Sequence, residues 1–315
     1  MIPVEEIRRA RERLAGIALR TPLVRLDVDS DVEVWLKLEV LQPVRSFKIR
    51  GAGNAIMRAS DDELAGGVWT TSAGNMAQGV AYAARLRGVR ATIIVPDTAP
   101  RTKLEAIERY GGRIVAVPYD VWWETMGTGR YEGMDGLLVH PFDDDVVIAG
   151  NGTIGLELLE DLPDFDTVVV PYGGGGLIAG IASAIKPERA GVRLIAAEPA
   201  TGAPVTASLA AGRRTEVPFT RSFVDAAGGH EVFEHMWHRT KDLMDGGIAL
   251  ETGETAAAVR LLAERTRVIA EGAGALPVAA ALSGRLADAR KIVAVVSGGN
   301  IDFSVLNRIL AGEQP

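Results

Sequence analysis

Short apolar runs alternate with segments of helical periodicity along most of this chain. Patterns of buried strands occur at residues 32–38, 67–71, 91–95, 113–117, 167–171, 192–197 and 291–296. Helical patterns lie between them, at residues 54–58, 78–87, 101–110, 153–162, 177–185 and 255–266. Strands that alternate with such helices are typical of βαβ units and a parallel sheet. The sequence therefore predicts an α/β fold, with residues 200–248 left unassigned.

Length and composition narrow the class of protein. The 315 residues are enough for two domains of roughly 100–200 residues each. A net charge of −7 disfavours a nucleic-acid partner, and the lack of cysteine excludes disulfides and thiolate metal sites. No basic segment followed by an apolar run opens the chain, so we expect a cytoplasmic protein. Residues 168–185 are apolar enough for a membrane span, but Pro171 and five glycines favour a strand, a turn and a helix, and hence no membrane partner.

Four polar or glycine-rich turns are expected to form a ligand site, because ligands of α/β sheets bind beyond the carboxyl ends of strands. The turns are Ser46-Phe47-Lys48, Ser72-Ala73-Gly74-Asn75-Met76, Gly173-Gly174-Gly175-Gly176-Leu177 and Ser297-Gly298-Gly299-Asn300.

The run of glycines allows three interpretations. Backbone N–H groups that converge before a helix favour a phosphate. Gly174, Gly176 and Ala179 also fit the dinucleotide pattern G-x-G-x-x-A, and Glu198 follows at the end of the next strand. The third interpretation is a tight turn without a ligand.

Together the four turns resemble the serine/threonine dehydratase (threonine ammonia-lyase) branch of the fold-type-II pyridoxal-phosphate enzymes, over residues 7–309. The resemblance implies a fold like that of the tryptophan synthase β chain, with two doubly wound lobes and pyridoxal 5'-phosphate in the cleft. Residues 1–60 and 145–315 would form the large lobe and residues 61–144 the small lobe. It also implies a homodimer.

The resemblance assigns roles to individual residues. Lys48 would hold the cofactor as a Schiff base, Asn75 would bond its phenolic oxygen, and Ser297 its pyridine nitrogen; the alternative role for Ser297 is to cap a helix. The phosphate would bind Gly173, Gly174, Gly175 and Gly176, with Phe47 and Leu177 also at the cofactor. The substrate carboxylate would bind the loop Ser72, Ala73, Gly74, Asn75 and Met76. Glu271 and Gly272 match a family segment near the ring.

These roles imply dehydrative deamination of a 3-hydroxy amino acid, with L-threonine and L-serine as default substrates. A lysine amine near a phosphate and an apolar wall can act as nucleophile and base. Family racemases carry a second serine where this chain has Ala73, so we expect elimination and not racemisation.

Several departures from the family pattern leave alternatives open. Met76 stands where a histidine is usual, and Val44-Arg45 where Thr-Gly is usual. If Trp122 and Trp123 also formed a pocket wall, these departures would suit a bulkier substrate, such as a phenylserine or a hydroxyectoine-pathway intermediate. In the alternative, Met76 and the tryptophans only fill space. A nicotinamide oxidoreductase and a catalytically silent binding protein are the other two hypotheses.

A metal site is not expected. Glu198 matches one acid of a cation site found in many family members, but Pro204 stands where the second acid would be. His230 and His235 miss the spacing that would place them on one helix face, and His238 follows in the same segment. We expect these histidines to be solvated.

Overall fold

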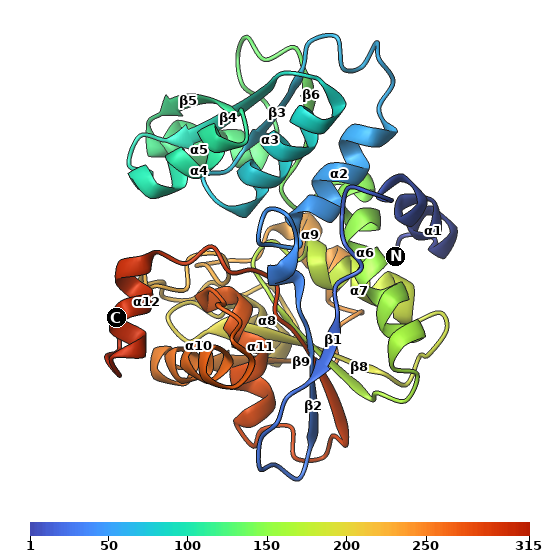
Figure 1. Cartoon of the computed structure of the whole chain (residues 1–315), viewed down its shortest axis with the longest axis vertical. Coiled ribbons are helices and arrows are strands. Elements are labelled where there is room, and N and C mark those ends of the chain that lie inside the picture. Colours follow the sequence, from blue (N-terminus) through green and yellow to red (C-terminus); the bar gives the residue numbers. More distant parts are fainter.

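The computed structural model describes residues 1–315 and has two lobes, each built around one sheet (Figure 1). The six-stranded sheet of the large lobe has the order β1 (Leu23–Arg25), β2 (Glu33–Lys37), β10 (Lys291–Val295), β7 (Thr167–Pro171), β8 (Arg193–Pro199) and β9 (Gly246–Leu250). The four-stranded sheet of the small lobe has the order β5 (Arg113–Val117), β4 (Ala91–Pro96), β3 (Val68–Thr71) and β6 (Leu137–Leu138). Only β1 pairs antiparallel; every other pair is parallel.

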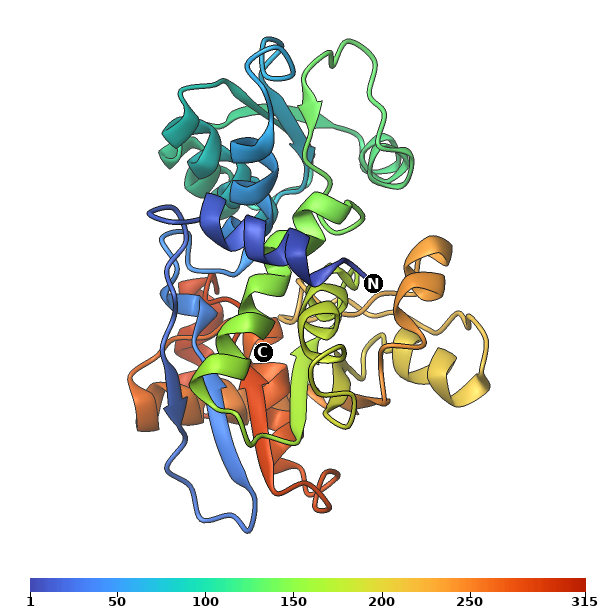
Figure 2. The same cartoon turned by 90° about the vertical axis from the view of Figure 1, so that its right-hand side faces the viewer.

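Helices cover both faces of the large sheet (Figure 2). Val168 and Val170 of β7 pack with one set, α6 (Asp145–Asp161), α7 (Gly176–Ile185), α8 (Pro204–Ala211) and α9 (Glu234–Thr240). Val169 packs with the other set, α10 (Thr252–Thr266), α11 (Gly272–Leu282) and α12 (Phe303–Leu310). Successive strand residues point to opposite faces, so a strand buried on both sides is apolar throughout. The expected α/β class is confirmed.

The remaining helices are α1 (Val4–Arg13), the short 3₁₀ helix η1 (Glu39–Leu41), α2 (Lys48–Arg58), α3 (Asn75–Arg87), α4 (Arg101–Arg109) and α5 (Tyr119–Thr128). Helix α1 packs on α6 and α7 of the large lobe, whereas α3, α4 and α5 pack on the small sheet. Residues of α2 were expected in the large lobe, but Ile49 and Ile56 belong to the apolar core of the small lobe. Helix α2 therefore joins the two lobes. No helix is both long enough and apolar enough to cross a membrane.

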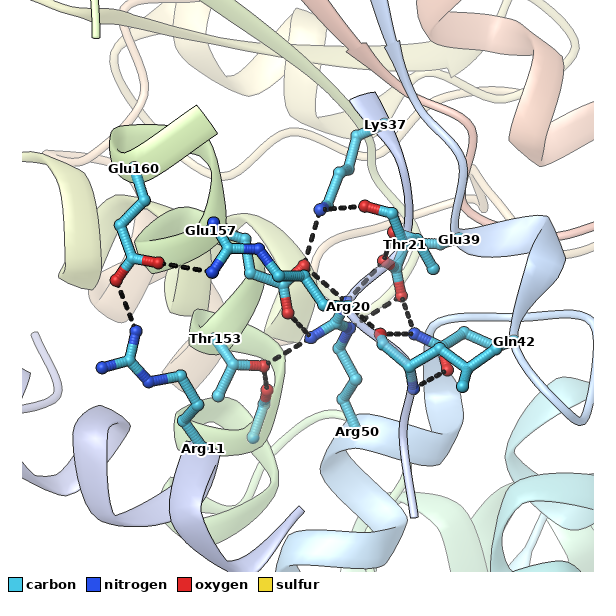
Figure 3. Close-up of polar contacts among 12 residues, drawn as sticks. Arg11, Arg20, Thr21, Lys37, Glu39, Gln42, Arg50, Thr153, Glu157 and Glu160 are labelled. Atoms are coloured by element: carbon cyan, nitrogen blue, oxygen red, sulfur yellow. Dashed lines mark hydrogen bonds and ion pairs between the residues drawn. The ribbon is translucent and has the colours of Figure 1, made fainter. Parts of the chain in front are cut away.

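A buried ionic network anchors α2 to the large lobe (Figure 3). The Arg50 guanidinium donates to Glu39 at 2.7 and 2.8 Å and to Glu157 at 2.6 and 2.9 Å. Lys37 Nζ lies 2.6 Å from Glu157 and donates to the Thr21 carbonyl at 2.7 Å. Burial alone would raise the pKa of Glu39, but the charge and hydrogen bonds of Arg50 hold it below its ordinary value. The network fixes the first turn of α2.

Candidate active site

Lys48 is the first residue of α2, and its side chain is half-buried. Nζ donates to the Pro141 carbonyl at 2.6 Å and lies 5.0 Å from the centroid of the Phe47 ring. Desolvation lowers the pKa of Lys48 to about 8, although the Glu271 carboxylate acts in the opposite direction. An amine with this pKa is partly unprotonated near neutral pH, so Lys48 can act as a nucleophile and as a base.

The turn before Lys48 is paired with the loop that follows β10. Phe47 N donates to the Ser297 carbonyl at 2.9 Å, and Ser46 forms an isolated antiparallel bridge with Gly298. The buried Ser46 hydroxyl has no partner within the protein. Asp302, and not Ser297, caps α12, so the helix-cap alternative for Ser297 is wrong. Two of the four turns are thereby brought together.

A third turn reaches this loop from the small lobe through Asn75. Asn75 Nδ2 donates to Glu271 Oε1 at 2.7 Å, and Asn75 Oδ1 accepts from Asn300 Nδ2 at 2.7 Å. Burial, followed by the nearby charge of Asp225, raises the pKa of Glu271 to about 7. Asn75, Glu271 and Asn300 thus link both lobes beside Lys48. Gly272 begins α11 immediately after Glu271.

The glycine run lies between β7 and α7 and offers unused donors. The N–H groups of residues 173–177 donate to no protein acceptor. A Cβ atom on Gly174 would lie 2.2 Å from the Phe142 ring, and one on Gly176 would lie 2.6 Å from the Phe142 carbonyl oxygen. Gly175 has a φ of 84°, which other residues rarely adopt. These free N–H groups at a helix N-terminus fit a phosphate group.

Comparison with known proteins agrees with this site. A family model described as pyridoxal-phosphate dependent enzyme matches residues 15–298. The chain belongs to this family. Its cofactor is therefore pyridoxal phosphate.

Relatives of the chain are similar over almost its whole length. An L-threonine ammonia-lyase of Thermotoga maritima is 40% identical over 98% of this chain and 78% of its own. A serine racemase of Oryza sativa subsp. indica is 37% identical, over 96% of this chain and 92% of its own. Among solved structures, maize serine racemase has a TM-score of 0.89 at 34% identity and covers 98% of this chain and 97% of its own. The processed form of threonine deaminase isoform 2 from Solanum lycopersicum has a TM-score of 0.86 at 33% identity, covering 98% and 88%. The expected fold-type-II architecture is confirmed.

Substitution in the glycine run should weaken cofactor binding in this pyridoxal-phosphate dependent enzyme. In Gly174→Asp, a Cβ atom must displace the Phe142 ring, and the new carboxylate repels the phosphate. We expect the Kd for pyridoxal phosphate, measured by absorption titration, to rise by about tenfold or more, equivalent to about 1.4 kcal/mol. Gly191→Ala is the matched control, because nothing lies within 4 Å of its Cβ position. An unchanged Kd in Gly174→Asp would place the phosphate elsewhere.

The loop between β3 and α3 has a second set of free N–H groups. Ser72 Oγ accepts from Gly74 N at 3.1 Å, whereas the N–H groups of Ala73 and of residues 75–77 donate to no protein acceptor. They suit a substrate carboxylate at the start of α3. Met76 requires a correction. Its side chain is 1% exposed and packs in the core of the small lobe, so the space-filling alternative holds and we no longer expect it to contact substrate.

The pair Val44-Arg45 also lies away from the expected substrate position. Val44 is fully buried in the core of the small lobe, whereas Arg45 is exposed. Arg45 has a φ of 60°, a left-handed conformation that glycine adopts more easily, which explains the glycine usual at this place. Neither side chain argues for a bulkier substrate.

The aromatic side chains of α5 pack between the lobes. Trp123 stacks on Phe233 with centroids 5.8 Å apart, and Phe233 lies 5.2 Å from Phe142, which covers Gly174. Trp122 lies beside Trp123 with centroids 6.2 Å apart. The packing interpretation of both tryptophans is favoured over a pocket wall.

Glu198 and the three histidines show no metal-binding arrangement. The Glu198 carboxylate is buried and accepts from Val205 N at 3.1 Å and from Thr206 N and Oγ1 at 2.7 and 2.8 Å. These hydrogen bonds use the Glu198 carboxylate at the start of α8. Glu198 is therefore not available to bind the ribose of a nicotinamide cofactor. His230 and His235 pair with single carboxylates, those of Glu231 and Asp143, and His238 is exposed. No group of three or more acidic or histidine residues is arranged to hold a metal.

Proposed function

We propose that this protein eliminates water and then ammonia from a 3-hydroxy amino acid, with L-threonine or L-serine as substrate and a 2-oxo acid as product. The observation that carries the proposal is the position of the Lys48 amine. It is held by the Pro141 carbonyl, next to the Phe142 ring on the glycine run, and its turn is hydrogen-bonded to Ser297. Relatives named threonine ammonia-lyase and threonine dehydratase support the reaction class.

Different residues of this chain would carry out different parts of the reaction. Bound pyridoxal phosphate supplies an electron sink for the pair left at Cα. Residues 173–177 would hold its phosphate, and Lys48 would hold its aldehyde carbon until an amino acid binds. The freed Lys48 amine, with a pKa of about 8, can then accept the Cα proton.

Three further groups would bias the outcome toward elimination. The N–H groups at the start of α3 would orient the substrate carboxylate. Ser297, 3% exposed, would offer the pyridine nitrogen a neutral hydroxyl that does not protonate it, which would limit the charge on the ring. Ala73 carries no group that could return a proton to the opposite face of Cα.

A screen of amino acids for 2-oxo acid and ammonia tests this function. We expect equal amounts of both products from L-threonine and L-serine, and slower turnover of phenylserine because the α5 tryptophans are packed. Chiral chromatography of the L-serine reaction should show little D-serine. No 2-oxo acid from any substrate would support the silent binding protein, whereas D-serine formed faster than pyruvate would make the protein a racemase.

We also propose that the protein assembles as a homodimer. The proposal rests on the resemblance to the dehydratase branch. Sedimentation of the holoenzyme tests the assembly, with a mass about twice the 33.4 kDa of one chain as the expected result.

A further inference from the structure

A single turn, residues 140–143, contacts both Lys48 and the glycine run. The Pro141 carbonyl accepts from Lys48 Nζ at 2.6 Å. The Phe142 ring and backbone fill the positions that Cβ atoms on Gly174 and Gly176 would need. The conformation of this turn therefore determines both the position of the Lys48 amine and the shape of the glycine run.

The imidazole of His140, the first residue of this turn, stabilises the turn through hydrogen bonds at both ring nitrogens. Its Nε2 lies 3.1 Å from the Met126 carbonyl of α5, and because a carbonyl only accepts, Nε2 must carry the proton. Its Nδ1 accepts from Asp143 N at 2.9 Å and from Phe142 N at 3.4 Å. Both contacts are satisfied together only by the neutral Nε2–H tautomer.

The surroundings of His140 favour this neutral form. Burial lowers the pKa of His140 and outweighs three groups that favour the cation, namely the Met126 carbonyl and the carboxylates of Asp143 and Asp144. The charge of Lys48 also disfavours the cation. Those two acids have other partners, because Asp143 pairs with His235 at 2.8 Å and Asp144 caps α6. Arg130 lines the cavity of about 300 Å³ beside the ring and adds a positive charge. The ring also meets the Phe142 ring edge-on at 4.8 Å.

We propose that His140, as the neutral Nε2–H tautomer, is a positioning residue that holds the 140–143 turn against α5 and thereby sets Lys48 and the phosphate-binding glycines. It touches neither the expected substrate nor the cofactor. It acts through the Pro141 carbonyl and the Phe142 ring. The inference rests on the proposed role of Lys48 and adds the residue that orients it.

Two substitutions separate the hydrogen bonds of His140 from its bulk. His140→Leu keeps the volume but accepts no hydrogen bond, whereas His140→Asn places an amide oxygen near the position of Nδ1. In the holoenzyme we expect His140→Leu to raise the Kd for pyridoxal phosphate and to lower kcat by about tenfold each, with less change in KM. His140→Asn should restore both to within about threefold of wild type. His238→Asn, a change at an exposed histidine, is the control and should match wild type.

Nitrogen NMR of ¹⁵N-histidine-labelled holoenzyme tests the tautomer without any turnover. With only 4 histidines in the chain, the signals lost in His140→Asn and His238→Asn assign the two rings. We expect His140 to be neutral and protonated at Nε2 at pH 7. A cationic ring, an Nδ1–H tautomer, a His140→Leu enzyme equal to wild type, or a His140→Asn enzyme as impaired as His140→Leu would each overturn the proposal. Failure of the Lys48 assignment would leave the tautomer unchanged, so the two failures are distinguishable.

Discussion

Lys48→Ala is expected to lower kcat for L-threonine by about 10⁴-fold or more, as is usual when a central catalytic group is removed. The variant loses the group that would hold the cofactor and the base that would accept the Cα proton. Alanine also leaves the Pro141 carbonyl without its donor, but the buried network of Arg50 still anchors α2. The fold should therefore persist, and single-turnover assays of 2-oxo acid release measure the loss.

The control for this prediction is Lys241→Ala. Lys241 follows α9 and has no ion pair, so its removal should leave kcat within about twofold, as for most surface substitutions. Near-normal turnover by Lys48→Ala would refute the assignment. The pH dependence offers a second check, because attachment of the cofactor should become faster as pH rises through about 8, where the Lys48 amine loses its proton.

Arg50→Met is expected to reduce the free energy of unfolding by about 3–5 kcal/mol, the usual cost of removing one partner of a buried ion pair. Methionine retains much of the volume but leaves Glu39 with only hydroxyl and amide partners, and Glu157 with Lys37 alone. Urea unfolding measures the difference. Arg20→Met is the matched control, because Arg20 is half-exposed where it pairs with Glu160 and should contribute about 0–1 kcal/mol.

The pH dependence of this difference has a definite sign. The pKa of Glu39 is held below 4.5 in the wild type, so its contribution to stability is present above pH 4.5 and is lost as pH falls through the folded pKa. Without Arg50, burial would raise the pKa of Glu39, and the carboxyl could be buried as the neutral acid. The stability gap should shrink below pH 4.5. A gap that is constant with pH would mean that Arg50 acts by packing alone.

The fully buried strands were predictable from sequence, because a strand buried on both faces is apolar throughout. Thr167–Pro171 is such a strand and has the expected bounds, as does the more exposed edge strand Arg113–Val117. The partly exposed strands β1 and β9 were not predicted. Helix beginnings were harder, since polar and glycine residues obscure the period. Helix α6 begins at Asp145 and not at residue 153. Helix α11 was missed because Pro277 and two glycines disguise it, although it is buried on every side.

The candidate site was predictable where a residue type is required by local chemistry. The glycines of residues 173–176 are needed for close approach and free N–H groups, and Lys48 for its amine. Whether Met76 points into the core or toward the substrate depends on which face of α3 packs on the sheet. The identity of one residue does not predict this orientation. His140 was missed for a similar reason. Its role depends on Met126 and on the contact between Lys48 and Pro141, residues 93 positions apart. The sequence His140-Pro141-Phe142 before the acidic turn was the available signal.

Borohydride reduction of the holoenzyme, followed by peptide mapping, tests the position of the cofactor most directly. We predict that reduction abolishes the visible absorption of the lysine-bound cofactor and the turnover together. The pyridoxyl group should then be found on the peptide that contains Lys48 and on no other lysine. A pyridoxyl group on a different lysine, or full activity after complete reduction, would contradict the assignment of Lys48 as the residue that holds pyridoxal phosphate.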